Sequence, residues 1–367
     1  MSSELPNLSN PRLNVAFWNV QNLFDPDISQ LATEFDYTAV SGWDRRATQS
    51  RIARLSQVIC GMFDGQGPDL LGLAEIENQR LADRLMQETA REDLQIVTPN
   101  DESLDACNTV LIYSSRHLEP TGSVQTWNIN PHHSVCDILE ATFRVKANGA
   151  EITVLINDWP GRNDGPDGLR HAAAAHCSRI VDRHLKLSRS EYLQLGHTDS
   201  AALRLNQHWN RNLLLMGDFS DEPWDVSLRD ILSADYSDRP MTSSVPGVGD
   251  RMPSWKSYAA IRPALFNPTW TALNGPDTGT VICSSRTGGA PALYDQMIIS
   301  GGLRQGLSGL RLVSPDRGSG RRQPLVRIHR PDIMKGSDGA PLAYECETGA
   351  GVSNHFPVLT SLELTDA

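Results

Sequence analysis

The chain lacks the sequence features of a membrane-spanning or secreted protein. It contains no run of about 18 apolar residues, so no transmembrane helix is predicted. The N-terminal segment MSSELPNLSNPRL has no basic start followed by an apolar stretch, so no secretory signal is predicted. We therefore expect a cytoplasmic protein with no membrane partner.

Cysteine is scarce, and positive charge is limited. The six cysteines form no Cys-x-x-Cys pair, which argues against a zinc ribbon and a disulfide scaffold and leaves ordinary buried thiols as the expectation. The net charge of −11 disfavours a coat protein for nucleic acid, because such binding needs many Lys and Arg to neutralise phosphates. One segment differs: from Arg304 to Lys335, eight basic residues accompany two acidic ones. A solvated surface loop is the favoured interpretation of this segment, and a phosphate-gripping flap is the alternative.

The stretch NLLLMGDFSDEPWD, residues 212–225, is the most informative in the chain. Its apolar run over 212–216 predicts a strand buried on both faces, which ends in the turn Gly217-Asp218-Phe219. A carboxylate at the end of a core strand is costly unless something compensates its charge, so Asp218 is a candidate site residue. The alternative is that Asp218 caps a following helical turn, which Pro223 would begin.

Strand and helix patterns alternate along the rest of the chain. Helices are predicted over 45–63, 79–90 and 169–187, and strands are predicted over 13–19, 69–78, 108–113, 140–146, 151–157, 293–300 and from 353 onward. The segments 188–210, 236–262 and 314–350 are expected to be loop insertions. No linker divides the chain, so residues 1–367 are expected to form a single domain.

Polar residues recur where the predicted strands end. They are Asn19, Glu75, Asp158, Asp218, Asp295 and the pair Asn354-His355. In a mixed α/β sandwich such ends gather at one edge of the sheets and can form a site. Their oxygen atoms suit a hard cation such as Mg²⁺ or Mn²⁺ better than zinc, and such an ion would polarise a phosphoryl oxygen. The histidines His132, His133, His176 and His184 are expected to be packed or at the surface.

Five short motifs occur in an order that resembles the endonuclease/exonuclease/phosphatase family of metal-dependent phosphoesterases. They are Asn19-Val20-Gln21-Asn22-Leu23-Phe24-Asp25, Leu73-Ala74-Glu75-Ile76-Glu77-Asn78, Gly217-Asp218-Phe219, Asp295-Gln296 and Ser353-Asn354-His355-Phe356-Pro357-Val358. The resemblance extends from Asn14 to about Leu364. It implies an α/β (α+β) fold with two packed mixed β-sheets flanked by helices, arranged as a four-layer sandwich.

The resemblance also implies roles for individual residues. Asn19, Glu75 and Asn354 would bind the metal. Asp218 would position or deprotonate the attacking water, and His355, oriented by Asp295, would contact the phosphate. The further candidates for substrate binding are Arg162, Arg170, Ser220 and Gln21, and the alternative for Arg170 is an ion pair on the surface of a helix.

Three site positions depart from the family pattern. Asp158 stands where the family usually has His, Ser220 where it has Asn, and Asn354 where it has Asp. The first change adds a negative charge that would repel a phosphodiester, whereas Asn354 can still bind a metal through its amide oxygen. The site residues Glu75, Asp218 and His355 are unchanged, which favours an active site with altered properties over a site that has lost its activity.

Two classes of function remain open from the sequence. The first is a divalent-metal-dependent hydrolase that acts on a small or soluble phosphate ester, with nucleic acid disfavoured as a substrate. The second is a family scaffold that performs a different reaction or only binds a cation or cationic ligand in an acidic cleft. The order of the motifs favours the hydrolase.

Overall fold

Two β-sheets form the centre of the molecule. The computed structural model describes residues 11–29, 32–35, 37–97, 109–127, 138–162, 167–195, 199–236, 243–247, 252–274, 278–283, 289–314 and 324–366. Sheet A has the strand order β14 (Leu310–Leu312), β16 (Val358–Leu364), β1 (Arg12–Leu23), β2 (Leu70–Ile76), β4 (Thr109–Ser114) and β3 (Leu94–Ile96), and β15 (Arg327–Ile328) also pairs with β16. Sheet B has the order β5 (Leu118–Trp127), β6 (Ile138–Val145), β7 (Glu151–Asp158), β8 (Asn212–Asp218), β13 (Asp295–Ser300), β10 (Leu265–Phe266) and β9 (Ala234–Asp235). A separate hairpin joins β11 (Val281–Cys283) to β12 (Ala290–Ala292).

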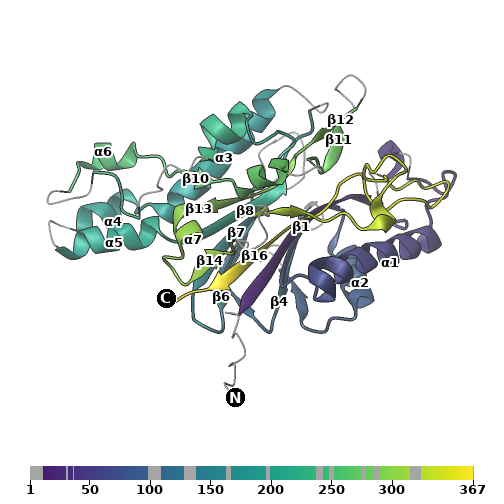
Figure 1. Ribbon diagram of the computed structural model, residues 1–367, viewed down its shortest axis with the longest axis horizontal. Helices are drawn as coiled ribbons and strands as arrows, with labels where there is room; N and C mark the ends of the chain where they lie inside the picture. Colours follow the sequence, from purple (N-terminus) through teal and green to yellow (C-terminus); the bar gives the residue numbers. More distant parts are fainter. Residues whose placement is uncertain are drawn as a thin grey trace, which may run out of the picture.

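Helices flank both sheets. The α-helices are α1 (Arg45–Gly61), α2 (Gln79–Thr89), α3 (Asp167–Leu185), α4 (Arg189–Gln194), α5 (Asp199–Trp209), α6 (Trp255–Ala259) and α7 (Gly301–Gln305). Short helical turns are η1 (Ala32–Phe35), η2 (Met62–Gly65), η4 (Ser227–Ile231), η5 (Pro268–Asn274) and η7 (Asp332–Met334). Figure 1 shows α1 and α2 beside sheet A and α3 on the far side of sheet B.

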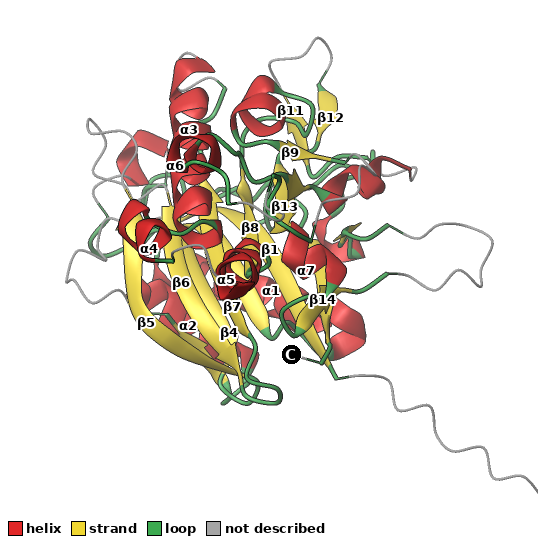
Figure 2. Ribbon diagram, turned by 90° about the vertical axis from the view of Figure 1, so that its left-hand side faces the viewer, coloured by secondary structure: helices red, strands yellow, loops and turns green. Residues whose placement is uncertain are grey.

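Alternating side chains of the strands build three apolar layers. Phe17 of β1, Ile156 of β7 and Met216 of β8 belong to the core between the two sheets. The neighbouring residue Trp18 packs with α1 on the outer face of sheet A, and Leu215 packs with α3 on the outer face of sheet B, because successive side chains of a strand point to opposite faces. The order helix, sheet, sheet, helix confirms the predicted four-layer sandwich. Figure 2 looks onto the face of the strands, with α4 and α5 in front of them.

Most predicted elements are present with shifted ends. The helix predicted over 45–63 ends at Gly61, because Phe63 and Asp64 adopt left-handed backbone angles, with φ of 52° and 57°. The strand predicted over 13–19 continues to Leu23. The last strand begins at Val358, so the Ser353-Asn354-His355 triplet precedes it and does not open it as predicted.

The loop predicted over 188–210 is wrong, since this insertion contains α4 and α5. Ser188 and Glu191 form a capping box that starts α4. Tyr192 stacks on Tyr258 at a centroid distance of 4.5 Å, and both rings belong to a small separate core that also includes Leu205. The insertion at 236–262 likewise contains α6, whereas 314–350 is partly outside the described residues. The assignment of 1–367 to one domain stays a prediction.

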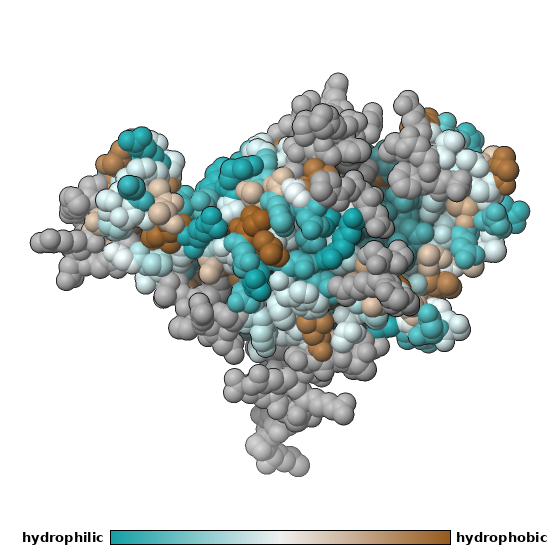
Figure 3. Space-filling view, turned by 90° about the horizontal axis from the view of Figure 1, so that it is seen from above, coloured by the Kyte–Doolittle hydropathy of each residue, from teal (hydrophilic) through white to brown (hydrophobic). Residues whose placement is uncertain are grey.

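Eight large hydrophobic side chains are exposed among the described residues. None of the described helices is both long and apolar enough to cross a bilayer. Most of the eight exposed side chains lie far apart along the chain, as at Ile28, Val40, Leu193 and Leu203, whereas Trp224 and Val226 are two positions apart. Figure 3 shows one face on which hydrophobic residues form separate spots within a mainly hydrophilic surface.

The thiols differ in part from the expectation of buried cysteines. Cys177 and Cys283 are buried, but Cys60 and Cys346 are only partly buried, and all four are free. Burial raises the pKa of the Cys177 thiol, so this group stays protonated at neutral pH. Cys107 and Cys136 lie outside the described residues.

Asp93 precedes β3 at the edge of sheet A and accepts hydrogen bonds from Arg91 and Ser114. These bonds predict that the stability of the protein falls in acid. Arg91 donates from Nη2 to Oδ2 of Asp93 at 2.7 Å, and Ser114 donates to the same oxygen at 2.6 Å. These bonds, chiefly the one from Arg91, hold the pKa of Asp93 well below its ordinary value. The folded state therefore takes up this proton less readily than the unfolded state, so the stabilisation exists at neutral pH and is lost as the pH falls below about 4.

We expect the urea midpoint of the wild type to fall between about pH 5 and pH 3, and to fall less steeply in an Asp93→Asn variant. Denaturation followed by circular dichroism at each pH would measure the difference. Parallel curves for the two proteins would contradict this role of Asp93.

Candidate active site

Three carboxylates lie in a row across the middle of sheet B. Asp158 pairs with Asp218 in the parallel β7/β8 ladder, and Asp218 pairs with Asp295 in the antiparallel β8/β13 ladder. On each strand, the residue two positions from the carboxylate faces the core between the sheets; these residues are Ile156, Met216 and Met297. Side chains two positions apart on a strand point to the same face of the sheet. The three carboxylates are therefore on the same inner face, at the edge of the sandwich.

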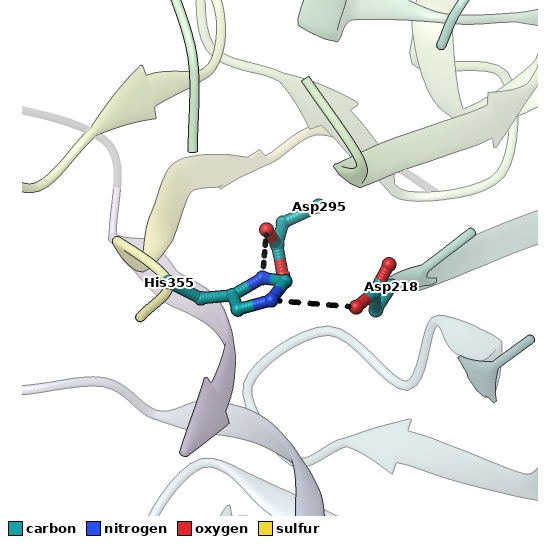
Figure 4. Close-up of side chains that lie close together, drawn as sticks. All are labelled: Asp218, Asp295 and His355. Atoms are coloured by element: carbon teal, nitrogen blue, oxygen red, sulfur yellow. Dashed lines mark hydrogen bonds and ion pairs between the residues drawn. The ribbon is translucent and has the colours of Figure 1, made fainter. Parts of the chain in front are cut away.

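His355 lies between two of these carboxylates (Figure 4). Its Nδ1 is 2.8 Å from Oδ2 of Asp295, and its Nε2 is 3.8 Å from Oδ2 of Asp218. The backbone carbonyl of His355 accepts a hydrogen bond of 2.9 Å from Nε1 of Trp18. Figure 4 shows the imidazole ring held with one nitrogen toward each acid. Asp295 therefore orients the ring, and Nε2 is directed toward Asp218.

The ionisation of this group follows from burial and from the short distances. Burial raises the pKa of Asp218 to about 6, although the positive charge of His355 opposes the shift. Burial alone would lower the pKa of His355, but the negative charges of Asp295, Asp218 and Glu75 outweigh it and raise this pKa to about 10. At neutral pH, Asp218 can therefore accept a proton, and the imidazolium can donate a hydrogen bond.

The predicted metal-binding residues come from sheet A and from the loop before β16. Nδ2 of Asn19 donates to Oε1 of Glu75 at 2.7 Å and to Oδ2 of Asp218 at 3.2 Å, which joins the two sheets. Oδ1 of Asn354 is buried and has no hydrogen-bond partner among the described residues. An unpaired buried oxygen is costly unless something compensates it. One carboxylate and two amide oxygens, of which that of Asn354 is unpaired, fit a hard divalent cation.

A second group of possible ligands, Asp218, Asp295 and His355, has atoms within 4.8 Å of one another. Both nitrogens of His355 already face carboxylates, and a protonated imidazole cannot bind a metal. Asn19, Glu75 and Asn354 are therefore the better candidates for a cation. The other group is the better candidate for proton transfer.

Backbone strain concentrates around these residues. Gln21, Asn22, Glu75 and Ser220 all have positive φ, between 49° and 62°. Each such residue costs about 1–3 kcal/mol and persists only where the surrounding contacts maintain it. Gly217 is required for a different reason, since a Cβ atom there would lie 2.3 Å from the carbonyl oxygen of Asn157. The motif residues around the site are therefore required by the backbone geometry as well as by the chemistry of the site.

Comparison with known proteins decides the family. A sequence model described as Endonuclease/Exonuclease/phosphatase family matches residues 14–246, which is more than half of the chain. The chain belongs to the endonuclease/exonuclease/phosphatase family. Members of this family are generally metal-dependent hydrolases of phosphoester bonds. No curated protein matches the chain significantly by sequence.

Solved structures share the fold at low sequence identity. A functionally unknown conserved protein from Enterococcus faecalis V583 has a TM-score of 0.52 and 11% identity, with 96% of this chain and 100% of that chain covered. A family protein from Bacteroides thetaiotaomicron has a TM-score of 0.51 and 13% identity, covering 96% and 98%. One from Bacteroides vulgatus has a TM-score of 0.50 and 11% identity, covering 97% and 100%. These similarities show the fold of the endonuclease/exonuclease/phosphatase family.

Two residues predicted to bind substrate form hydrogen bonds with the protein backbone. Oε1 of Gln21 accepts hydrogen bonds from the backbone N–H groups of Tyr344 and Asn354, and its Nε2 donates to the carbonyl of Tyr344. Ser220 is buried and donates from Oγ to the carbonyl of Trp159 at 3.2 Å. The polar atoms of both residues are used within the protein, and their substrate-binding role stays a prediction.

The two predicted phosphate-binding arginines are also engaged internally. Arg170 is buried, with its Nε 2.8 Å from Oδ1 of Asp221 and an ion pair to Asp167. Arg162 donates to the carbonyl of Ser220 at 3.0 Å and pairs with Asp225 and, at 3.1 Å, with Asp221. The helix-surface ion pair that had been the alternative for Arg170 is present, but the guanidinium is buried. Both arginines hold the segment after β8 in place, and their substrate-binding role stays a prediction.

Removing Arg170 should destabilise the protein strongly. An Arg170→Met variant would leave buried Asp221 with the hydrogen bond from Ser227 and, as its one remaining ion pair among the described residues, the longer contact to Arg162. Breaking a buried ion pair costs about 3–5 kcal/mol. We expect a loss of about 3 kcal/mol in unfolding free energy, measured by urea denaturation. Arg229→Met is the matched control, since its pair with Asp230 is exposed and its loss should change little. Equal stability of the two variants would contradict the structural role of Arg170.

Asp158 ends β7 beside Asp218, as the carboxylate row requires. The preceding residue, Asn157, points to the opposite face, where its Oδ1 accepts hydrogen bonds from Nε1 of Trp159 and Sγ of Cys177, both at 3.1 Å. Asp158 is therefore on the site face, which is the position of the His that the family usually has. Its side chain is partly buried.

Other predictions meet mixed outcomes. Pro223 lies in a turn and starts no helix, and Oδ1 of Asp218 accepts from the N–H of Ser220, two residues away, at 2.9 Å.

His184 lies 2.7 Å from Glu140 of β6, a carboxylate that the helical spacing of α3 could not reveal. In the basic segment, the guanidinium carbon of Arg304 lies 3.8 Å from the centre of the Phe266 ring, and Arg311 pairs with Glu363. These contacts favour packing on the protein surface over phosphate binding for the two arginines. Residues 315–323 lie outside the described residues. His132 and His133 also lie outside them.

Two residues near the site were missed from the sequence. Asp221 binds Arg170 and also accepts a hydrogen bond of 2.6 Å from Ser227. Arg51 is buried beneath β1 and donates to its backbone. The signal for Arg51 was present: Arg51, Leu55 and Val58 have the i, i+4, i+7 spacing of a buried helix face, where an arginine is unusual.

Proposed function

We propose that this protein hydrolyses a small or soluble phosphate ester with the help of a divalent cation, Mg²⁺ or Mn²⁺, and that residues 1–367 act as one domain. The observation that carries the proposal is the position of His355 between Asp295 and Asp218, with Asn19 bonded to both Asp218 and Glu75. This arrangement brings a proton acceptor, a cationic donor and oxygen ligands to one edge of the sandwich.

Each protein group has a role that its environment supports. Asp218 accepts the proton of the attacking water, since its raised pKa of about 6 keeps it a usable base near neutral pH. His355 donates from Nε2 to a phosphoryl oxygen and stabilises the negative charge that grows there. Asp295 accepts the Nδ1 proton and thereby fixes the ring orientation and its charge.

Asn19, Glu75 and Asn354 are the residues that would hold the cation. When bound, a divalent cation supplies positive charge that offsets the charge developing on the phosphoryl and leaving oxygens. Asn354 contributes a neutral oxygen where the family usually has Asp, so the ligand set is less negative by one charge. Asp158 places a negative charge on the other side of the site, beside Asp218.

The proposed substrate class is supported by the charges around the site. Asp158 lies in the site, and the predicted phosphate-gripping arginines, Arg162 and Arg170, are already paired with Asp221 and Asp225 or Asp167. A polyanion such as a nucleic acid strand is attracted by unpaired basic groups and repelled by acidic ones. The net charge of −11 adds to this repulsion. These charges support a compact phosphate ester as substrate.

Metal dependence tests the proposal directly. We expect Mn²⁺ or Mg²⁺ to raise hydrolysis of 4-nitrophenyl phosphate or bis(4-nitrophenyl) phosphate by at least about 100-fold over the EDTA-treated protein, since the cation contributes several kcal/mol. A single-stranded oligonucleotide is the competing substrate, and faster turnover of it would replace the small-substrate part of the proposal.

A variant that restores the family pattern provides the matched control. The triple change Asp158→His, Ser220→Asn and Asn354→Asp should retain metal-dependent hydrolysis and should increase activity on the phosphodiester relative to the monoester. If neither the wild type nor this variant hydrolyses any of the three substrates with either metal, the protein is not a phosphoesterase, and binding of a cation or another reaction becomes the better account.

A further inference from the structure

Strand β1 contains a bulge whose carbonyl groups are bound by a single buried arginine. The β1/β2 register shifts between Asn19 and Leu23, and we call residues 20–22 the β1 bulge. Arg51 of α1 donates from Nη2 to the carbonyls of Val20, at 2.6 Å, and of Gln21, and from Nη1 to the carbonyl of Asn22 at 3.0 Å. The irregular register removes these carbonyls from regular pairing, and one guanidinium satisfies all three.

The surroundings of Arg51 are unusual for a buried cation. The side chain is completely buried, and no ion pair among the described residues includes it. Its guanidinium carbon lies 4.4 Å from the ring centre of Tyr344, 5.6 Å from Tyr37 and 5.7 Å from Trp43. Nη1 also donates to the hydroxyl of Tyr37 at 3.3 Å. Aromatic faces and carbonyl dipoles thus replace the carboxylate that usually accompanies a buried charge.

The β1 bulge in turn contacts every predicted cation ligand. The N–H of Asn22 donates to Oε2 of Glu75 at 2.7 Å, and the N–H of Gln21 donates to Oδ1 of Asn19 at 2.9 Å. Oε1 of Gln21 accepts from the N–H of Asn354 at 2.8 Å. These bonds require the positive φ of Gln21 and Asn22, 58° and 49°, which turn the two N–H groups toward the site while the carbonyls face Arg51.

We propose that Arg51 is a positioning residue that sets the geometry of the cation-binding oxygens through the β1 bulge. Its planar guanidinium holds three carbonyls in one fixed relation, and the strained backbone that results aims Asn19, Glu75 and Asn354 at a common centre. Arg51 itself touches neither cation nor substrate. The inference rests on the proposed function, since it assumes that these oxygens bind a divalent cation.

The test measures Mn²⁺ binding to the full-length protein without substrate, by calorimetry, together with amide hydrogen exchange of the metal-free protein by mass spectrometry. In Arg51→Met, we expect Mn²⁺ affinity to fall at least tenfold and exchange to accelerate in peptides covering 19–23 and 352–356, with peptides of β8 unchanged. Arg51→Lys should show a smaller loss than Arg51→Met, because its ammonium group keeps the positive charge, but some loss should remain, because the group cannot reach all three carbonyls. If Arg51→Met does not fold, Arg51→Lys is the variant that tests the proposal.

Two controls separate positioning from general destabilisation. Leu55→Ala removes a fully buried side chain of the same helix and should lower the Tm while Mn²⁺ affinity stays within twofold of the wild type. Tyr344→Phe keeps the ring over Arg51 and removes a hydroxyl that has no hydrogen-bond partner among the described residues, and it should change neither readout.

Two results would overturn the role of Arg51. The first is wild-type Mn²⁺ affinity and exchange in a folded Arg51 variant, and the second is an equal loss of affinity in Leu55→Ala. If the wild type itself binds no Mn²⁺, the proposed function fails instead. Hydrogen exchange then still tests whether Arg51 holds the β1 bulge and the residues bonded to it: unchanged rates at 19–23 and 352–356 refute this, and faster rates support it.

Discussion

Replacing Asp218 with Asn should lower kcat/KM for phosphate-ester hydrolysis by about 10³-fold, because an amide cannot accept the proton of the attacking water. The side chain keeps its size, and one amide oxygen can still accept from the N–H of Ser220, as the carboxylate does at 2.9 Å. The fold and Mn²⁺ binding should therefore persist. Rates measured with Mn²⁺ on 4-nitrophenyl phosphate or its diester would show the loss, and circular dichroism would check the fold.

The pH profile provides an independent check on Asp218. Burial raises its pKa to about 6, and a general base works only when deprotonated. The wild-type rate should therefore fall as the pH is lowered through about 6, and the residual rate of Asp218→Asn should lack this inflection. Asp230→Asn, a change at an exposed ion pair, should behave like the wild type. A variant at position 218 that keeps the full rate would exclude Asp218 as the base.

Replacing His355 with Gln should reduce kcat/KM by about 10²–10³-fold, the range measured when one donor to a developing oxyanion is removed. The raised pKa of His355, about 10, keeps the imidazole positively charged at neutral pH, and neutral Gln cannot supply that charge. The loss should appear mainly in kcat, since the donor acts on charge that develops during the reaction. Single-turnover kinetics at saturating Mn²⁺ would measure it.

Asp295 allows a sharper version of the same experiment. Because Asp295 acts through His355, to which it lies 2.8 Å away, Asp295→Asn should also slow the reaction, and the double variant should be no slower than His355→Gln alone. Losses that multiply in the double variant would mean that Asp295 acts independently, for example on the cation, and would revise its role.

The site could be predicted from the sequence because its residues sit in short motifs next to strong strand patterns. Asp218 follows the apolar run 212–216, and the structure places it at the end of β8 as predicted. The sequence could not show that β1 continues beyond Asn19 through the bulge at residues 20–22 to Leu23, because Gln21 and Asn22 adopt positive φ, which non-glycine residues seldom do. Tertiary contacts impose those angles.

The polar residues near the site were harder to interpret. Arg162, Arg170, Ser220 and Gln21 have side chains suited to binding phosphate, yet each is engaged with other protein groups. Whether a polar side chain faces a substrate or a neighbouring loop depends on contacts between segments that are far apart in sequence. Gln21 and Asn354, for instance, are separated by 333 positions. No local pattern contains that information.

The sequence by itself determined the four-layer α/β sandwich, the order of its main strands and helices, and the family to which the chain belongs, because hydrophobic periodicity and short motifs are local properties. Only the tertiary structure decided that Asp158, Asp218 and Asp295 form one row, that His355 lies between two acids, and that Arg51 binds the β1 bulge. These arrangements depend on strand register and on the packing of distant segments, which are set when the whole chain folds.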